Sequence, residues 1–184
     1  MSEQATATPE CLITDEWMTP PEWYGRFNAE FQFTCDAAAD ERTHQCPVWF
    51  GRGGIEPNGL TADWTRHKSI FDNMPFSDIE PWVKKAWGSI GPKQTRGVLR
   101  TIMLLVPSRT DQTWWLQHVE PYRDGNDGGM LAEQDLIFKV RHLPRIKFIP
   151  PPRVKATTPR FGCSQLIWQV KPTLLPSLDY SETP

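Results

Sequence analysis

The stretch at residues 70–82 constrains the fold more than any other part of the chain. It starts apolar, breaks at the turn Asn73-Met74-Pro75-Phe76, and resumes with helix-start signals. Ser77 or Asp78 can cap a helix, and Glu80 lies three residues after Ser77, as in a capping box. The stretch therefore predicts a strand, a tight turn and a helix. In an open α/β sheet such a turn lies at the carboxyl edge of a strand, where ligands usually bind.

A second strand and helix follow. Residues 98–106 are almost continuously apolar and end before Pro107, which predicts a buried strand. Residues 111–119 then predict a helix that bears Trp114 and Trp115. Trp in an amphipathic helix is usually a core residue, so we expect both side chains to be buried rather than to stack on a nucleobase. This alternation predicts an α/β fold with a mostly parallel sheet flanked by helices. We also expect a helix at 22–31 and strands at 31–35, 136–140, 146–149 and 165–170.

The length of 184 residues and the apolar content suit one domain. We expect a disordered tail at residues 1–10, a single domain at 11–171 and a loose tail at 172–184. No apolar run approaches the roughly 18–20 residues of a membrane span, and the N-terminus lacks a signal pattern, so we expect a soluble, cytoplasmic protein. The cysteines lack zinc-site spacing, and Cys35, His44 and Cys46 lack a convincing fourth ligand. We therefore expect no metal and free thiols.

The net charge of −2 hides an asymmetry. Residues 1–64 contain 11 acidic and 3 basic side chains, whereas residues 139–171 contain 8 Lys or Arg and no Asp or Glu. This basic stretch is sufficient to contact polyanionic DNA, and it is equally well explained as a solvated surface.

The turn at residues 73–76 resembles the Asn/Asp-Pro-Pro-Tyr/Phe motif of amino-group methyltransferases that use S-adenosylmethionine, with Met74 replacing the first proline. A proline fixes φ and Met does not, so we expect a looser turn. Other segments occur in an order and spacing similar to phage-type (Dam-like) DNA N6-adenine methyltransferases: 15–21, 31–39, 63–64, 113–115, 145–148 and 161–164. The resemblance covers most of the chain and implies a Rossmann-like S-adenosylmethionine-dependent methyltransferase fold.

By this resemblance, the chain transfers a methyl group to the N6 amino group of adenine in DNA. Catalysis then falls on Asn73, Met74, Pro75 and Phe76. The Asn73 side-chain oxygen and the Met74 carbonyl would accept the amino hydrogens, and Phe76 would stack on the base. The adenine must be flipped out of the duplex or single-stranded to reach them.

The resemblance also implies cofactor and DNA contacts. Cofactor binding falls on Trp17, Thr19, Pro20, Asp36, Ala37 and Asn73. Asp63 is a weaker candidate, because an acid before a core Trp is usually a surface residue. Phosphate contacts are expected from Arg145, Lys147, Arg153, Lys155 and Arg160. His118 and His142 show no sequence partners, so we expect structural or surface roles.

The leading hypothesis is a phage enzyme with a short or lax target sequence that protects or marks the phage genome in the host cytoplasm, as in restriction–modification. A second hypothesis keeps methyl transfer but places it on RNA adenine or protein glutamine. A third is a catalytically degenerate relative that binds DNA or cofactor. The oligomeric state is left open.

Overall fold

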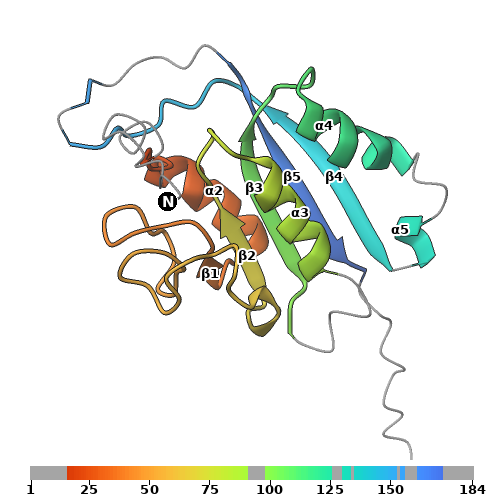
Figure 1. Ribbon diagram of the computed structural model, residues 1–184, viewed down its shortest axis with the longest axis horizontal. Helices are drawn as coiled ribbons and strands as arrows, with labels where there is room; N and C mark the ends of the chain where they lie inside the picture. The colour runs from red at the N-terminus through yellow and green to blue at the C-terminus, as the bar shows by residue number, and fades with distance from the viewer. Residues whose placement is uncertain are drawn as a thin grey trace, which may run out of the picture.

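The computed structural model describes residues 16–90, 98–125, 130–133, 135–152, 154–155 and 161–171, and a five-stranded sheet runs through them (Figure 1). The strand order is β1-β2-β3-β5-β4. The strands are β1 (Cys35–Asp36), β2 (Ser69–Asp72), β3 (Thr101–Pro107), β4 (Leu136–Leu143) and β5 (Cys163–Val170).

Strand directions confirm the predicted fold class. β1 pairs parallel with β2, and β2 with β3. β5 runs antiparallel to both β3 and β4, so four described strands share one direction and β5 alone opposes them. The sequence did not predict this reversal, because β5 inserts between strands that precede it in the chain. The sheet is therefore mixed, and its parallel half carries the predicted turn.

Helices cover both faces of the sheet, because the buried strands present apolar side chains to both sides. The helices are α2 (Pro21–Phe31), α3 (Glu80–Ser89), α4 (Thr113–His118) and α5 (Met130–Glu133), with 3₁₀ turns η1 (Trp64–Arg66) and η2 (Glu120–Gly125). Phe71 of β2 packs in one core cluster with Phe27 and Phe31 of α2. Ile70 packs in a second cluster with Trp82 of α3 and Trp115 of α4. Figure 1 shows α3 and α4 on the same side of the sheet.

The predicted capping box is wrong. α3 begins at Glu80, with Ile79 at the N-cap position and no side-chain cap. Pro81 lies in the first turn, where its missing N–H forfeits no helical hydrogen bond. The Glu80 carboxylate instead accepts from Lys84 Nζ at 2.6 Å and lies 3.3 Å from His118 Nε2. The Glu80 side chain that a capping box would use is thus engaged by Lys84 of the same helix and by His118 of α4.

Two predicted strands are shorter in the structure. α2 continues through Phe31 and ends where Gln32 adopts a left-handed conformation, so the strand expected at 31–35 starts only at Cys35. The strand expected at 146–149 contributes a single antiparallel bridge between Ile149 and Met18. The expected tails, Arg153, Arg160 and Cys11 lie outside the described residues.

Several side chains take structural roles. Trp114 and Trp115 are buried, as expected, and His142 Nδ1 lies 3.0 Å from Ser164 Oγ. Asp63 caps η1, because its carboxylate accepts from the Thr65 backbone N–H at 3.1 Å. Cys35, Cys46 and Cys163 are buried free thiols. In the described ranges, no cluster of His, Cys, Asp or Glu suits a metal ion, and no helix has the length and apolarity to cross a membrane.

Asp72, the last residue of β2, is a buried acid without a hydrogen bond. Its side chain is 0% exposed, and neither oxygen has a partner among the described residues. Burial raises the pKa of Asp72 well above its usual range, and the neighbouring charge of Asp36 raises it further. Burial also raises the pKa of Asp36 to about 7, against the opposing hydrogen bonds from Gln45 and Ala38. Burial therefore disfavours the charged form of both carboxyls when no cation lies beside them.

The substitution Asp72→Asn removes this ionisation and keeps the side-chain shape. The pKa of Asp72 is higher in the folded chain than in the unfolded chain. Wild-type Asp72 therefore contributes fully to the free energy of unfolding below its unfolded pKa, and this contribution falls as the pH rises toward its folded pKa. We expect the free energy of unfolding of D72N, relative to wild type, to increase between pH 5 and 8, by at most about 1.4 kcal/mol per pH unit. Urea unfolding across this range measures it. Asp111→Asn, at an exposed acid, should show a constant difference, and parallel curves for D72N and wild type would contradict the argument.

Candidate active site

The turn after β2 holds two hydrogen-bond acceptors at the carboxyl edge of the sheet. Asn73 Nδ2 donates to the backbone oxygen of Trp17 at 2.8 Å, which fixes the side-chain amide. Within the described part of the chain, neither Asn73 Oδ1 nor the Met74 carbonyl oxygen accepts a hydrogen bond. The turn therefore contains one side-chain oxygen and one backbone oxygen that accept no hydrogen bond from the described residues, and Asn73 lines a cavity.

The buried Met74 side chain holds this turn against the core. Its side chain is 2% exposed and belongs to the core cluster that also contains Ile79 and Val83. The proline of the family motif restricts the backbone, whereas Met74 holds the turn through burial of its side chain.

Phe76 places an aromatic ring beside the turn. It is partly buried and meets Phe148 edge to face, with ring centroids 5.7 Å apart at 87°. Phe161 lies 6.2 Å from Phe76 at 64°. Ile149 pairs with Met18, next to the Trp17 carbonyl that holds Asn73. The segment that carries Arg145 and Lys147 is therefore adjacent to the turn.

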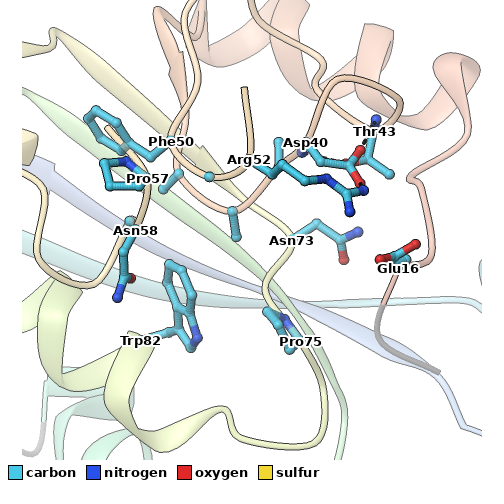
Figure 2. A pocket seen from close by; sticks show the side chains of 15 residues that line it. Glu16, Asp40, Thr43, Phe50, Arg52, Pro57, Asn58, Asn73, Pro75 and Trp82 are labelled. Atoms are coloured by element: carbon cyan, nitrogen blue, oxygen red, sulfur yellow. Dashed lines mark hydrogen bonds and ion pairs between the residues drawn. The ribbon is translucent and has the colours of Figure 1, made fainter. Parts of the chain in front are cut away.

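A cavity of about 390 Å³ opens beside the turn (Figure 2). Small-molecule sites usually measure roughly 300–1,000 Å³. Figure 2 shows Glu16, Asp40 and Thr43 near Asn73, and Phe50, Pro57 and Trp82 at the opposite end. The complete lining is Glu16, Ala37, Ala38, Ala39, Asp40, Thr43, Phe50, Gly51, Arg52, Pro57, Asn58, Gly59, Asn73, Pro75 and Trp82.

Close backbone packing shapes the cavity wall. A Cβ on Gly59 would lie 1.9 Å from the Ala37 carbonyl oxygen and 3.0 Å from the Trp82 ring. Gly51, with φ of 127°, likewise approaches the Ala39 carbonyl. The loop that follows β1 can therefore cover the alanines only because these positions lack side chains.

The end of the cavity near Asn73 is rich in acidic and polar groups. Asp40 accepts hydrogen bonds from the Arg42 and Thr43 backbone N–H groups and forms an ion pair with Arg52 at 2.9 Å. A smaller chamber of about 30 Å³ adjoins this end and is lined by Glu16, Trp17, Thr19, Asp36, Ala38, Thr43, Gln45, Phe71 and Asn73. Thr19 Oγ1 is buried there without a partner among the described residues. Arg52 balances the charge of Asp40, so Glu16, Asp36 and the unused hydroxyl are the groups that suit a ligand with positive charge and polar groups.

The structure brings most of the sequence-predicted residues together. Trp17, Thr19, Asp36 and Asn73 line the small chamber, and Ala37 lines the main cavity. Pro20 lines neither cavity, because it precedes α2 and its carbonyl accepts the Trp23 and Tyr24 N–H groups. The roles of these residues stay predictions, since proximity does not test function.

Sequence reasoning missed the opposite wall of the cavity. Phe50 and Asn58 lie in a stretch that shows only turn-rich sequence, and Trp82 is only one aromatic of an amphipathic helix. The cluster of glycines at 51–59 was the available signal, because such spacing often marks close backbone approach.

Comparison with known proteins decides the family. The family model described as DNA N-6-adenine-methyltransferase (Dam) matches residues 6–173. The chain belongs to the Dam family. The "DNA N-6-adenine-methyltransferase" of Escherichia phage T1 is 31% identical over 84 residues, which covers 45% of this chain and 34% of that protein. The matched region thus spans about a third of this curated relative.

Among solved structures, a protein provisionally named as an RNA methyltransferase from Pyrococcus horikoshii is similar with a TM-score of 0.37 and 10% identity. The match covers 65% of this Dam-family chain and 49% of that protein. This likeness is too weak to inform the site.

The Dam family implies use of S-adenosylmethionine, and the cavity fits this cofactor. S-adenosylmethionine carries a sulfonium and an ammonium, which match the acids near Asn73, and an adenine ring, which matches the apolar end near Phe50 and Trp82. The unpartnered hydroxyl of Thr19 offers one further polar contact.

The cavity wall gives a test of packing. We expect Gly59→Ala to lower the free energy of unfolding by about 1–3 kcal/mol, because its Cβ would collide with the Ala37 carbonyl. Gly25→Ala is the matched control: Gly25 lies in α2 with nothing within 4 Å of an added Cβ, so alanine there should stabilise the chain by up to about 1 kcal/mol. Thermal unfolding measures both, and equal melting temperatures for the two variants would refute the close approach.

Proposed function

We propose that this chain transfers the methyl group of S-adenosylmethionine to the N6 amino group of adenine in DNA. The observation that carries the proposal is the turn after β2, where Asn73 is fixed by the Trp17 carbonyl and lines a cavity of cofactor size. The Dam-family match supports the reaction class, and the phage T1 relative supports a phage genome in a host cytoplasm as the setting.

The cofactor supplies an electrophilic methyl group when it is bound. Glu16 and Asp36 would hold its cationic end, and Thr19 would offer a hydroxyl that has no partner among the described residues. Ala37 lets the backbone approach the ligand, and the Trp17 carbonyl keeps Asn73 oriented. Phe50 and Trp82 provide apolar surface for the cofactor's adenine ring. Pro20 acts through the start of α2, since its carbonyl binds that helix.

The turn activates the acceptor nitrogen by positioning. The exocyclic nitrogen of adenine is a poor nucleophile because its lone pair is delocalised into the ring. Asn73 Oδ1 and the Met74 carbonyl would accept its two hydrogens, which favours a tetrahedral nitrogen with its lone pair directed toward the methyl group. Pro75 restricts the backbone after these acceptors, and Phe76 supplies a ring for the base to stack on. Such a base must be flipped or single-stranded.

The decisive experiment measures nucleosides by mass spectrometry after DNA is incubated with the protein and S-adenosylmethionine. We expect N6-methyladenine with wild type and a rate about 10²- to 10³-fold lower with Asn73→Ala, which removes one aligned acceptor. Gln117→Ala, on the exposed side of α4, is the control and should match wild type.

Absence of N6-methyladenine from duplex and single-stranded DNA, with cofactor still bound, would refute the DNA proposal and favour RNA adenine or protein glutamine. Absence of cofactor binding as well would favour a degenerate relative. Equal rates for N73A and wild type would remove Asn73 from the mechanism.

Basic residues beside the turn are proposed to contact phosphates. Arg145, Lys147 and Lys155 are exposed, and no hydrogen bond or ion pair engages their side chains in the described residues. Arg141 differs, because it forms a two-armed ion pair with Glu30 at 2.6 Å and its charge is already balanced. The Phe148–Phe76 contact places this segment next to the proposed base site. Arg153 and Arg160 remain proposed from the sequence alone.

Charge reversal tests these contacts. We expect Arg145→Glu and Lys147→Glu to weaken DNA binding and to reduce the slope of log affinity against log salt by about 1 each, since each phosphate contact releases a counterion. Fluorescence anisotropy across salt concentrations measures both. Lys68→Glu is the matched control, because Lys68 is exposed just before the amino end of β2, at the edge of the sheet opposite the turn. An identical loss with K68E would show that only net charge matters.

A further inference from the structure

A second cavity, of about 230 Å³, borders the catalytic turn and has no role in the proposed reaction. Its lining comes from residues 76–80 on one side and from Arg109 and residues 112–114 on the other. No residue lines both this cavity and the cofactor cavity. The turn separates them, with Asn73 and Pro75 on the cofactor side and Phe76 on the other.

This second cavity is built on a braced frame. One wall is the start of α3 and the other is the loop between β3 and α4. His118 of α4 lies 3.3 Å from the Glu80 carboxylate, and the Trp87 indole N–H of α3 donates to the His118 carbonyl at 2.9 Å. These contacts fix α3 against α4, so the cavity walls keep their spacing.

The lining is mostly polar and includes two aromatic residues. Phe76 and Trp114 supply aromatic surface. The side chains of Asp78 and Gln112 are exposed and make no hydrogen bond within the described residues. Arg109 extends over the Phe161 ring, with its guanidinium carbon 5.3 Å from the ring centroid. Aromatic floors stack on nucleobases, and carboxylate and carboxamide groups bind their edges.

The acidic residues in the lining indicate which part of a nucleotide, the phosphate or the base, the cavity can bind. A bare phosphate is disfavoured beside Asp78 and Glu80. Of the base edges that face the major groove, only those of adenine and cytosine carry an amino group, and these edges suit the acids, because Asp accepts from cytosine N4 and Gln pairs with adenine N6 and N7. The target adenine is flipped or unpaired, so the neighbouring base is joined to it only through the backbone of the same strand. A cavity that shares Phe76 with the target site lies next to that backbone and can receive the neighbouring base.

We propose that this second cavity binds the nucleobase adjacent to the target adenine, an adenine or cytosine, and that Asp78 and Gln112 select it by hydrogen bonds to its amino-bearing edge. The inference rests on the proposed methylation of DNA. It makes these two side chains the determinants of sequence context, while Asn73 and Met74 act on the target itself.

The test maps N6-methyladenine in a random-sequence DNA library, in duplex and single-stranded form, by sequencing. Wild type should prefer adenine or cytosine at one position next to the methylated adenine. Gln112→Ala and Asp78→Asn should each reduce that preference about 5- to 100-fold, the discrimination expected of one base contact. Gln117→Ala and Asp111→Asn are matched controls, since both are exposed near the cavity but outside its lining. Both controls should keep the wild-type context.

DNA binding is measured for variants that methylate DNA too slowly for their sequence preference to be mapped. Removing the neighbouring base to leave an abasic site should weaken DNA binding by wild type and should have little effect on Q112A and D78N. Circular dichroism confirms that each variant is folded.

The outcomes separate the two proposals. Wild type that makes no N6-methyladenine in DNA overturns the proposed function, and this inference with it. Wild type that methylates DNA without any preference at a neighbouring base overturns the inference alone. The inference also fails if Q112A and D78N keep the wild-type context, or if Q117A and D111N lose it equally.

Discussion

The hydrogen bond from Asn73 Nδ2 to the Trp17 carbonyl ties the site together, because it joins three segments far apart in the chain. It fixes the amide at the end of β2, where Asn73 lines both cavities. It holds the segment before α2, whose next residue, Met18, pairs with Ile149. That pairing in turn places Phe148 against Phe76. A single donor thus positions the acceptors, one wall of the small chamber and the basic segment.

The buried strands hold the turn in place. Every residue of β2 is buried, and Asp72 lies directly beneath the turn without a partner among the described residues. A buried carboxyl of this kind costs stability at neutral pH. The cost is tolerated because β2 pairs on both sides, with β1 and β3, and packs against helices on both faces. Stability is therefore supplied by the strands, and the turn needs only the Asn73 contact and the buried Met74 side chain to hold its shape.

The sequence predicted those elements whose signals are local. Two apolar strands, each followed by a helix, were sufficient to place the turn at the carboxyl edge of a partly parallel sheet. It did not predict the reversed β5, because strand order depends on pairings between residues far apart, such as Leu104 with Leu166. The capping box failed for the same reason, since Glu80 is engaged by His118 of α4. The wall formed by Phe50, Asn58 and Trp82 likewise exists only after the loop folds over the alanines.

The absence of regular strands beyond β1 in the described sheet has a consequence for the site. A loop, residues 40–59, covers the cavity where a further strand would otherwise lie, and its contacts are specific ones: the Asp40 network with Thr43 and Arg52, and the glycine approaches at 51 and 59. Apolar packing also holds this wall, because Phe50 is buried in the core cluster that contains Ile70 and Trp82, and Trp49 pairs with Asp36 of β1. The two sides of the cavity are therefore fixed by separate contacts. The turn depends on Asn73 and the buried Met74 side chain, and the loop depends on Phe50 and the Asp40 network.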